Sequence, residues 1–186
     1  MRTTTTAAAQ YRTLAERFAR VAGRLDPAAW DRPSPCEGWT ARDVVAHVIG
    51  TQRDFLQQQG IALDGPAEPM TDPAAAWDAH SAAMAACLDQ SGVAETPYEG
   101  MFGPSTVGET LLTFYGFDMV VHRWDVAAAA GRSDLFDGEE MDRLEGNIAA
   151  FGEHLYMEGI CGPAVEVPGD APRQDRLLAT LGRAPR

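Results

Sequence analysis

The sequence predicts an all-α fold, a bundle of helices followed by a C-terminal tail. Apolar residues recur three and four positions apart in several segments, which is the spacing of one face of an amphipathic helix. Thr or Asp precedes several of these segments and is suited to cap a helix N-terminus. The alternation of apolar and polar residues that is typical of strands is not evident in the first 158 residues. Together these observations favour helices along most of the chain.

The first three helices are expected before residue 91. Tyr11 and the apolar residues that follow it at helical spacing predict a helix over Ala7–Leu25. Asp26-Pro27 ends this helix, because the proline ring disfavours helical geometry at the preceding residue. The second helix is expected over Thr40–Gly60, opening on a hydroxyl and a carboxylate three residues apart, a capping-box pattern. The third is expected over Asp72–Gln90, because Asp is a good cap and Pro suits the first turn.

Two longer helices and a tail complete the predicted architecture. After a break at Gly100–Pro104, the fourth helix is expected over Thr106–Gly131 and the fifth over Gly138–Glu158. In the tail, Gly162–Pro168 is expected to be extended and Gln174–Leu181 to form a short helix. A length of 186 residues fits one domain. The sequence therefore predicts a single domain over residues 1–186, with the bundle at about 7–158 and the tail at 159–186.

Composition excludes several classes of partner. The net charge is −12, all 15 basic residues are Arg, and no basic stripe is visible, so neither nucleic acid nor an anionic membrane is an expected partner. The N-terminus lacks an apolar signal-peptide core, and no apolar stretch approaches the roughly 20 residues that span a bilayer. The cysteines form no C-x-x-C pair, which argues against a disulfide framework or a thiolate zinc site. We therefore expect a soluble, cytoplasmic protein with reduced thiols.

The histidines provide the strongest chemical signal. Three of them have an acidic residue four positions away on the same predicted helix face, in the pairs Asp43/His47, Asp118/His122 and His154/Glu158. Chance readily produces this spacing, so the surroundings must separate the pairs. Asp43 already serves as a capping carboxylate, and His154/Glu158 lies near a helix end, which is typical of a surface pair.

Asp118/His122 differs because it lies on an apolar helix face. Val107, Leu111 and Val121 define that face, and Asp118 falls near its middle at 100° per residue. A buried carboxylate without a partner costs several kcal/mol, so another group must satisfy it. His47 lies at the edge of the apolar stripe of the second helix and could approach the pair.

Two interpretations of this trio remain open. His47, Asp118 and His122 would form a three-ligand site with open positions, the arrangement of a catalytic metal. Alternatively, Asp118 and His122 are an internal hydrogen-bonded pair, and His47 is an ordinary residue between helices.

Two segments resemble a known family. Residues 33–50, PSPCEGWTARDVVAHVIG, resemble the N-terminal signature of the mycothiol-dependent maleylpyruvate isomerase N-terminal domain family, and residues 117–127, FDMVVHRWDVA, resemble its second metal segment. That family belongs to the DinB-like superfamily of four-helix metal-binding proteins. The tail, residues 162–168 and 175–183, is similar to that of an actinobacterial subgroup of uncharacterised metal-binding proteins.

The resemblance implies a DinB-like four-helix bundle with a divalent metal on His47, Asp118 and His122. Zinc is the usual metal of the family, and nickel, iron or manganese would suit the same donors. The isomerase is known for a Glu at the position of Asp118, and other relatives use a His. Asp reaches one methylene less than Glu, which affects metal distance and identity.

The implied function is that of a metal-dependent thiol S-transferase or isomerase acting on a small electrophile, with mycothiol as the thiol co-substrate. Coordination by a dication would hold the thiol as its thiolate. A homodimer is compatible with this reading. The isomerase has a second, C-terminal domain, whereas a short tail is expected here, so maleylpyruvate itself is not the expected substrate. The alternatives are a non-catalytic metal- or ligand-binding stress protein and a bundle whose metal site has decayed.

Three further residues are candidates around this site. Asp125 could orient a ligand imidazole from behind or form a salt bridge with an arginine such as Arg123 or Arg42. His80, among alanines on the third helix, could line the substrate pocket. Cys36 could be a reactive thiol just ahead of a helix or a small packed residue beside a tryptophan.

Overall fold

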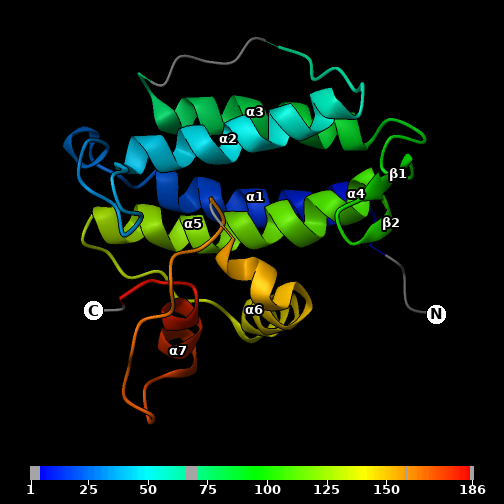
Figure 1. Ribbon diagram of the computed structural model, residues 1–186. Coiled ribbons are helices and arrows are strands. Elements are labelled where there is room, and N and C mark those ends of the chain that lie inside the picture. The colour runs from blue at the N-terminus through cyan, green and yellow to red at the C-terminus, as the bar shows by residue number, and fades with distance from the viewer. Residues whose placement is uncertain (1–4, 66–70, 158, 185–186) are drawn as a thin grey trace.

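The computed structural model describes residues 5–65, 71–157 and 159–184. These residues are mostly helical, with one small antiparallel sheet (Figure 1). The α-helices are α1 (Ala7–Ala22), α2 (Ala41–Gln58), α3 (Pro73–Leu88), α4 (Val107–Thr110), α5 (Gly116–Ala129), α6 (Gly138–Phe151) and α7 (Arg173–Thr180). Short 3₁₀ segments cover Pro27–Ala29 and Gly152–Tyr156, and a π-helical segment covers Leu111–Tyr115.

Helices α1, α2, α3 and α5 lie side by side in two layers, α2 with α3 and α1 with α5 (Figure 1). Helix α1 packs against α3 and α5, and α2 packs against α5 and α3. Helix α6 crosses the outer side of α5, and α7 packs on α6. The metal-ligand candidates on α2 and α5 therefore belong to two helices in direct contact.

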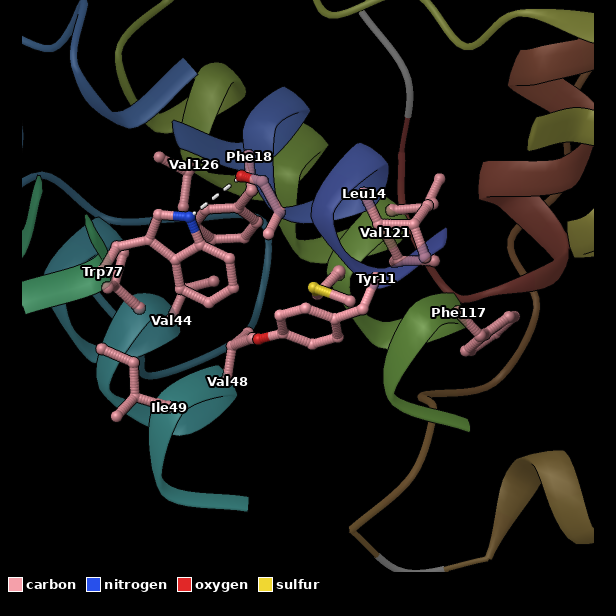
Figure 2. Close-up of a cluster of buried hydrophobic side chains, with 14 of the residues drawn as sticks. Tyr11, Leu14, Phe18, Val44, Val48, Ile49, Trp77, Phe117, Val121 and Val126 are labelled. Carbon is pink, nitrogen blue, oxygen red and sulfur yellow. Dashed lines mark hydrogen bonds between the residues drawn. The ribbon is translucent and has the colours of Figure 1, made fainter. Parts of the chain in front are cut away.

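The core lies between these four helices, and Figure 2 shows its centre. The ring of Phe18 on α1 lies 4.3 Å from that of Trp77 on α3, measured between ring centroids. The indole nitrogen of Trp77 donates a hydrogen bond of 3.1 Å to the carbonyl of Ala15. The apolar faces expected from helical spacing are buried here, including Tyr11, Leu14, Phe18, Val44, Val45 and Val48.

The predicted starts of α2, α3 and α4 are confirmed. The Thr40 hydroxyl accepts from the Asp43 amide while the Asp43 carboxylate accepts from the Thr40 amide, the reciprocal capping box. Asp72 caps α3 through the Ala75 amide, and Thr106 forms a second capping box with Glu109 at α4. The first helix ends at Ala22, three residues earlier than expected, and α7 begins one residue earlier than expected.

The expectation of helix without strand before residue 158 is wrong at one place. Strands β1 (Pro97–Gly100) and β2 (Gly103–Thr106) form an antiparallel hairpin in which Gly100 pairs with Gly103. Gly103 has a φ of 105°, a conformation that favours glycine at the turn. Strands of four residues are too short to produce a recognisable alternation, so the sequence pattern did not indicate them.

The two long C-terminal helices are also interrupted. The predicted fourth helix consists of α4, the π-helical segment and α5. The predicted fifth helix ends at Phe151, where Gly152 adopts a φ of 53° and a 3₁₀ turn follows. Glu158, the expected end of that helix and partner of His154, lies outside the described residues. In the part of the chain that is described, no helix is both long and apolar enough to cross a membrane.

Candidate metal centre

The structure brings His47, Asp118 and His122 together at the contact between α2 and α5. His47 Nε2 lies 3.5 Å from Asp118 Oδ2, and His122 Nε2 lies 3.2 Å from Asp118 Oδ1. The two imidazole rings are 5.1 Å apart between centroids and nearly perpendicular. One ligand atom from each of the three residues lies within 4.8 Å of the others.

Local structure explains this convergence. The capping box at Thr40 fixes the start of α2, so that His47 faces α5 from the second turn. Asp118 and His122 are four residues apart, on the same face of α5 and one turn from each other. Trp39, just before α2, has its ring centroid 4.7 Å from that of His47 and 6.2 Å from that of His122. Its indole therefore forms one wall of the site.

The donor set fits a divalent metal. In tetrahedral zinc sites, metal–ligand bonds of about 2.0–2.2 Å place neighbouring ligand atoms about 3.3–3.6 Å apart. The two imidazole nitrogens lie 3.5 and 3.2 Å from Asp118, in or next to this range, each from a different carboxylate oxygen. The side chains of His47 and Asp118 are 27% and 26% exposed, whereas His122 is buried. Three ligands with one solvent-accessible side are typical of a catalytic metal site.

The electrostatics of the trio favour positive charge. Burial by itself would lower the pKa of His122, but the charge of Asp118 and hydrogen bonds with Asp118 and Asp125 raise this pKa well above 6.5. Contacts with His122 and His47 hold the pKa of Asp118 below its ordinary range despite burial. Contacts with His122 and Arg183 do the same for the pKa of Asp125. A dication would satisfy the same carboxylate charges.

Asp125 lies behind His122. Its Oδ2 is 2.9 Å from His122 Nδ1, and its side chain is fully buried. This contact directs the other ring nitrogen, Nε2, toward Asp118. The suggested salt bridge of Asp125 with Arg123 or Arg42 is wrong, because its ionic partner is Arg183, with Nη2 2.9 Å from Oδ2.

The two other arginines are engaged elsewhere. Arg123, next to His122 in the chain, binds Asp134 and Glu140. Arg42 pairs with Asp31. Sequence reasoning therefore indicated that Asp125 could pair with an arginine, but it did not identify which arginine. Arg183 lies 58 residues from Asp125, and no spacing rule distinguishes it from the other arginines.

Cys36 also belongs to this neighbourhood. Its Sγ lies 3.2 Å from Asp125 Oδ2 and 3.9 Å from His122 Nδ1, and Arg183 Nη2 donates to it at 3.3 Å. Cys36, His122 and Asp125 thus form a second group with metal-ligand proximity. The guanidinium already contacts two of these three residues, and its charge would oppose a dication there. The first trio is therefore the better candidate for binding a metal.

His80, the candidate for the substrate pocket, is buried in the core beside Gln52 of α2. Its Nε2 is 3.0 Å from Gln52 Oε1, which also accepts a hydrogen bond of 2.7 Å from the Tyr11 hydroxyl. His80 and Gln52 are 4% and 0% exposed. Among the described residues, His80 Nδ1 and Gln52 Nε2 find no hydrogen-bond partner.

This burial predicts a pH-dependent stability. Burial, with a smaller contribution from Arg53, lowers the pKa of His80 to about 3, against about 6.5 in an unfolded chain. Below pH 6.5 the unfolded chain binds a proton that the folded chain excludes, so the free energy of unfolding falls as the pH decreases. The contribution is about 1.4 kcal/mol per pH unit between pH 6 and 4. Urea unfolding of wild type and His80→Gln at pH 7.5, 6.0 and 5.0 measures it.

Carboxylates titrate in both wild type and His80→Gln, so the difference between their free energies of unfolding at each pH isolates the contribution of His80. We expect His80→Gln to flatten the pH dependence and His154→Gln, at an exposed position, to leave it unchanged. Equal slopes for wild type and His80→Gln would contradict the prediction.

Comparison with known proteins identifies the family of the chain. The family model described as "Mycothiol maleylpyruvate isomerase N-terminal domain" matches residues 11–127, a stretch that contains His47, Asp118, His122 and Asp125 but not Arg183. Two proteins of Mycobacterium tuberculosis, "Uncharacterized protein MT0763" of strain CDC 1551 / Oshkosh and "Uncharacterized protein Rv0738" of strain H37Rv, are each 30% identical over 161 residues. The alignment covers 83% of this chain and 85% of each relative. No solved structure matches the chain. The chain belongs to the mycothiol maleylpyruvate isomerase N-terminal domain family.

Proposed function

We propose that this protein is a metal-dependent thiol S-transferase or isomerase that acts on a small electrophile. The observation that carries the proposal is the convergence of His47, Asp118 and His122 on one point with an exposed side. Membership of a family described by mycothiol supports a low-molecular-weight thiol as co-substrate. The arrangement of α1, α2, α3 and α5 supports the DinB-like four-helix architecture. Three free cysteines suit a reducing cytoplasm.

Three residues would bind the metal, and two others would position and shield them. His47 and His122 would supply neutral imidazole nitrogens, and Asp118 would supply the one anionic oxygen, to zinc or to nickel, iron or manganese. A bound divalent metal supplies the positive charge that keeps a coordinated thiol deprotonated. Asp125 fixes the ring of His122 through Nδ1, and Trp39 screens one side of the site from water.

The chemistry of the thiol follows from this charge. Its sulfur would form a bond to an electrophilic carbon of the substrate. Departure of a leaving group with the bonding electron pair completes a transfer. Addition to a conjugated double bond, rotation and loss of the same thiol complete an isomerisation. Both outcomes need one open side at the metal, which the exposure of His47 and Asp118 provides.

Elemental analysis of purified, untagged protein tests the metal site. We expect about one equivalent of a transition metal in the wild type, little in His122→Ala, and the wild-type amount in His154→Ala. His154 is the matched control because it is an exposed histidine outside the trio. A wild type that carries no metal, and gains no thermal stability with added zinc, nickel, iron or manganese, would exclude the proposal.

A second assay separates catalysis from storage. Metal-loaded protein is mixed with a chromogenic aryl halide and with mycothiol or cysteine. The rate of thiol consumption is compared between wild type and His122→Ala. We expect consumption that depends on both protein and metal. Full metal occupancy without thiol-dependent turnover across a panel of electrophiles would instead favour the non-catalytic binding protein.

A further inference from the structure

We infer that the C-terminal tail completes the metal centre, because Arg183 fixes the carboxylate of Asp125 against His122. Metal binding and docking of the tail are then coupled. The inference rests on the proposed metal site and adds to it a positioning residue that lies outside the family match, which ends at residue 127.

The guanidinium of Arg183 holds Asp125 at two points. Nη2 donates to Asp125 Oδ2 at 2.9 Å, and Nε donates to Oδ1 at 3.3 Å. A two-point contact fixes the orientation of a carboxylate as well as its position. The same Oδ2 lies 2.9 Å from Nδ1 of His122. A continuous series of contacts thus runs from the tail through Asp125 to the imidazole ring of His122, a proposed metal ligand.

Burial makes the loss of these contacts costly, because solvent does not reach the charged groups. Asp125 is fully buried and Arg183 is 7% exposed, so water cannot replace the guanidinium without cost. Without Arg183, the Asp125 carboxylate would lose the guanidinium that contacts both of its oxygens. The Cys36 thiol and the His122 ring, both at Oδ2, would remain. The ring of His122, held from behind by that carboxylate, would then lose its fixed orientation.

Tight packing of the tail positions the guanidinium. Arg183 Nη1 donates to the Leu181 carbonyl at 2.7 Å, and the Arg183 amide donates to the Leu178 carbonyl at 2.9 Å. Gly182 has a φ of 77°, and a Cβ there would lie 2.9 Å from the Gly162 carbonyl oxygen. Leu178 and Leu181 are fully buried. The guanidinium therefore extends from a packed segment of backbone.

The tail is also anchored at a distance from the site. Arg173, at the start of α7, pairs with Asp142 and Glu145 on α6. From α7 the chain returns toward α5, which carries Asp125 (Figure 1). Docking of α7 on α6 and the contact of Arg183 with Asp125 are thus two separate attachments of one segment.

The test compares the zinc affinities of four untagged proteins by competition with a chromogenic chelator. We expect Arg183→Met to weaken zinc binding about 10–100-fold, the usual effect of losing a group that supports a metal ligand. Arg183→Lys should recover part of the loss, because it keeps the charge but not the two-point geometry. Arg176→Met is the matched control, since Arg176 is an exposed arginine of α7 that bonds within the tail, to the Ala171 carbonyl.

Coupling is reciprocal, so zinc must also protect the tail. Hydrogen exchange of the amides at 177–183 is compared in wild type with and without zinc, and we expect slower exchange with zinc. This second measurement needs no variant and remains decisive even where Arg183→Met does not fold.

The outcomes separate the two proposals. A wild type that binds no zinc overturns the proposed function and this inference with it. A wild type that binds zinc, with equal affinity in Arg183→Met or with equal exchange of the tail in both states, overturns this inference alone. A lower melting temperature of metal-free Arg183→Met with unchanged zinc affinity would make Arg183 merely structural.

Discussion

Replacing Asp118 by asparagine is expected to weaken zinc binding by more than about 100-fold, which exceeds the loss typical of a supporting residue. Asp118 is the one anionic donor of the trio and lies between the two imidazoles. An amide of the same size keeps the shape but removes the charge that attracts the dication. Chelator competition measures the change, and circular dichroism checks that the helical content is unchanged.

Two variants sharpen this prediction. Asp43→Asn also removes an acidic side chain at helical spacing from a histidine, but Asp43 caps α2 and lies outside the trio. It removes a negative charge from the first turn of α2, so it should cost about 0.3–1 kcal/mol of stability and leave zinc affinity unchanged. Asp118→Glu keeps the charge with one more methylene, so it should bind zinc better than Asp118→Asn. Wild-type affinity in Asp118→Asn would remove Asp118 from the ligand set.

Local patterns of the sequence predicted the half of the site that one helix carries. Asp118 and His122 are one turn apart. A carboxylate among apolar residues of the sequence indicated that a cation or hydrogen-bond donor must lie nearby. The contribution of His47 required a guess about which helices meet, and α2 does pack on α5. The caps at Thr40, Asp72 and Thr106 were readable because capping involves residues only three positions apart.

Contacts between distant residues were not readable. Arg183 approaches Cys36 across 147 residues, and a single arginine among 15 has no pattern that names its partner. The face assigned to Asp118 shows a second limit. Treating residues 107–129 as one α-helix placed Asp118 near the middle of the buried face, but its side chain is 26% exposed. The π-helical segment at Leu111–Tyr115 adds a residue to one turn of the helix. Residues before this segment are therefore rotated by about 100° relative to α5, compared with a continuous α-helix.

Replacing Arg123 by methionine is expected to lower the free energy of unfolding by about 3–5 kcal/mol, the usual cost of removing one partner of a buried ion pair. Arg123 donates to Glu140 through Nη1 at 2.6 Å and Nη2 at 3.1 Å, and through Nε to Asp134 at 2.7 Å. The side chains of Arg123 and Glu140 are 4% and 5% exposed. The variant would leave the Glu140 carboxylate with Arg17 as its remaining cation. Urea unfolding measures the loss.

A matched arginine and a double variant test this explanation. Arg173 forms a similar fork with Asp142 and Glu145, but its exposed pairs should be worth about 1 kcal/mol or less. Arg123→Met/Glu140→Leu should recover part of the stability, because the buried carboxylate that lost its Arg123 partner is no longer present. A cost no larger than that of Arg173→Met would contradict the prediction.

Arg123 and His122 are neighbours in sequence but serve different contacts. Arg123 joins α5 to α6 through Glu140, whereas His122 faces α2 and the metal-ligand trio. Arg123→Met should therefore lower stability while the folded fraction keeps wild-type zinc affinity. Arg183→Met should lower zinc affinity as well as stability, because its guanidinium is also buried and acts on Asp125 behind the ring of His122. Measuring both quantities in both variants separates the cation that joins two helices from the cation that positions a ligand.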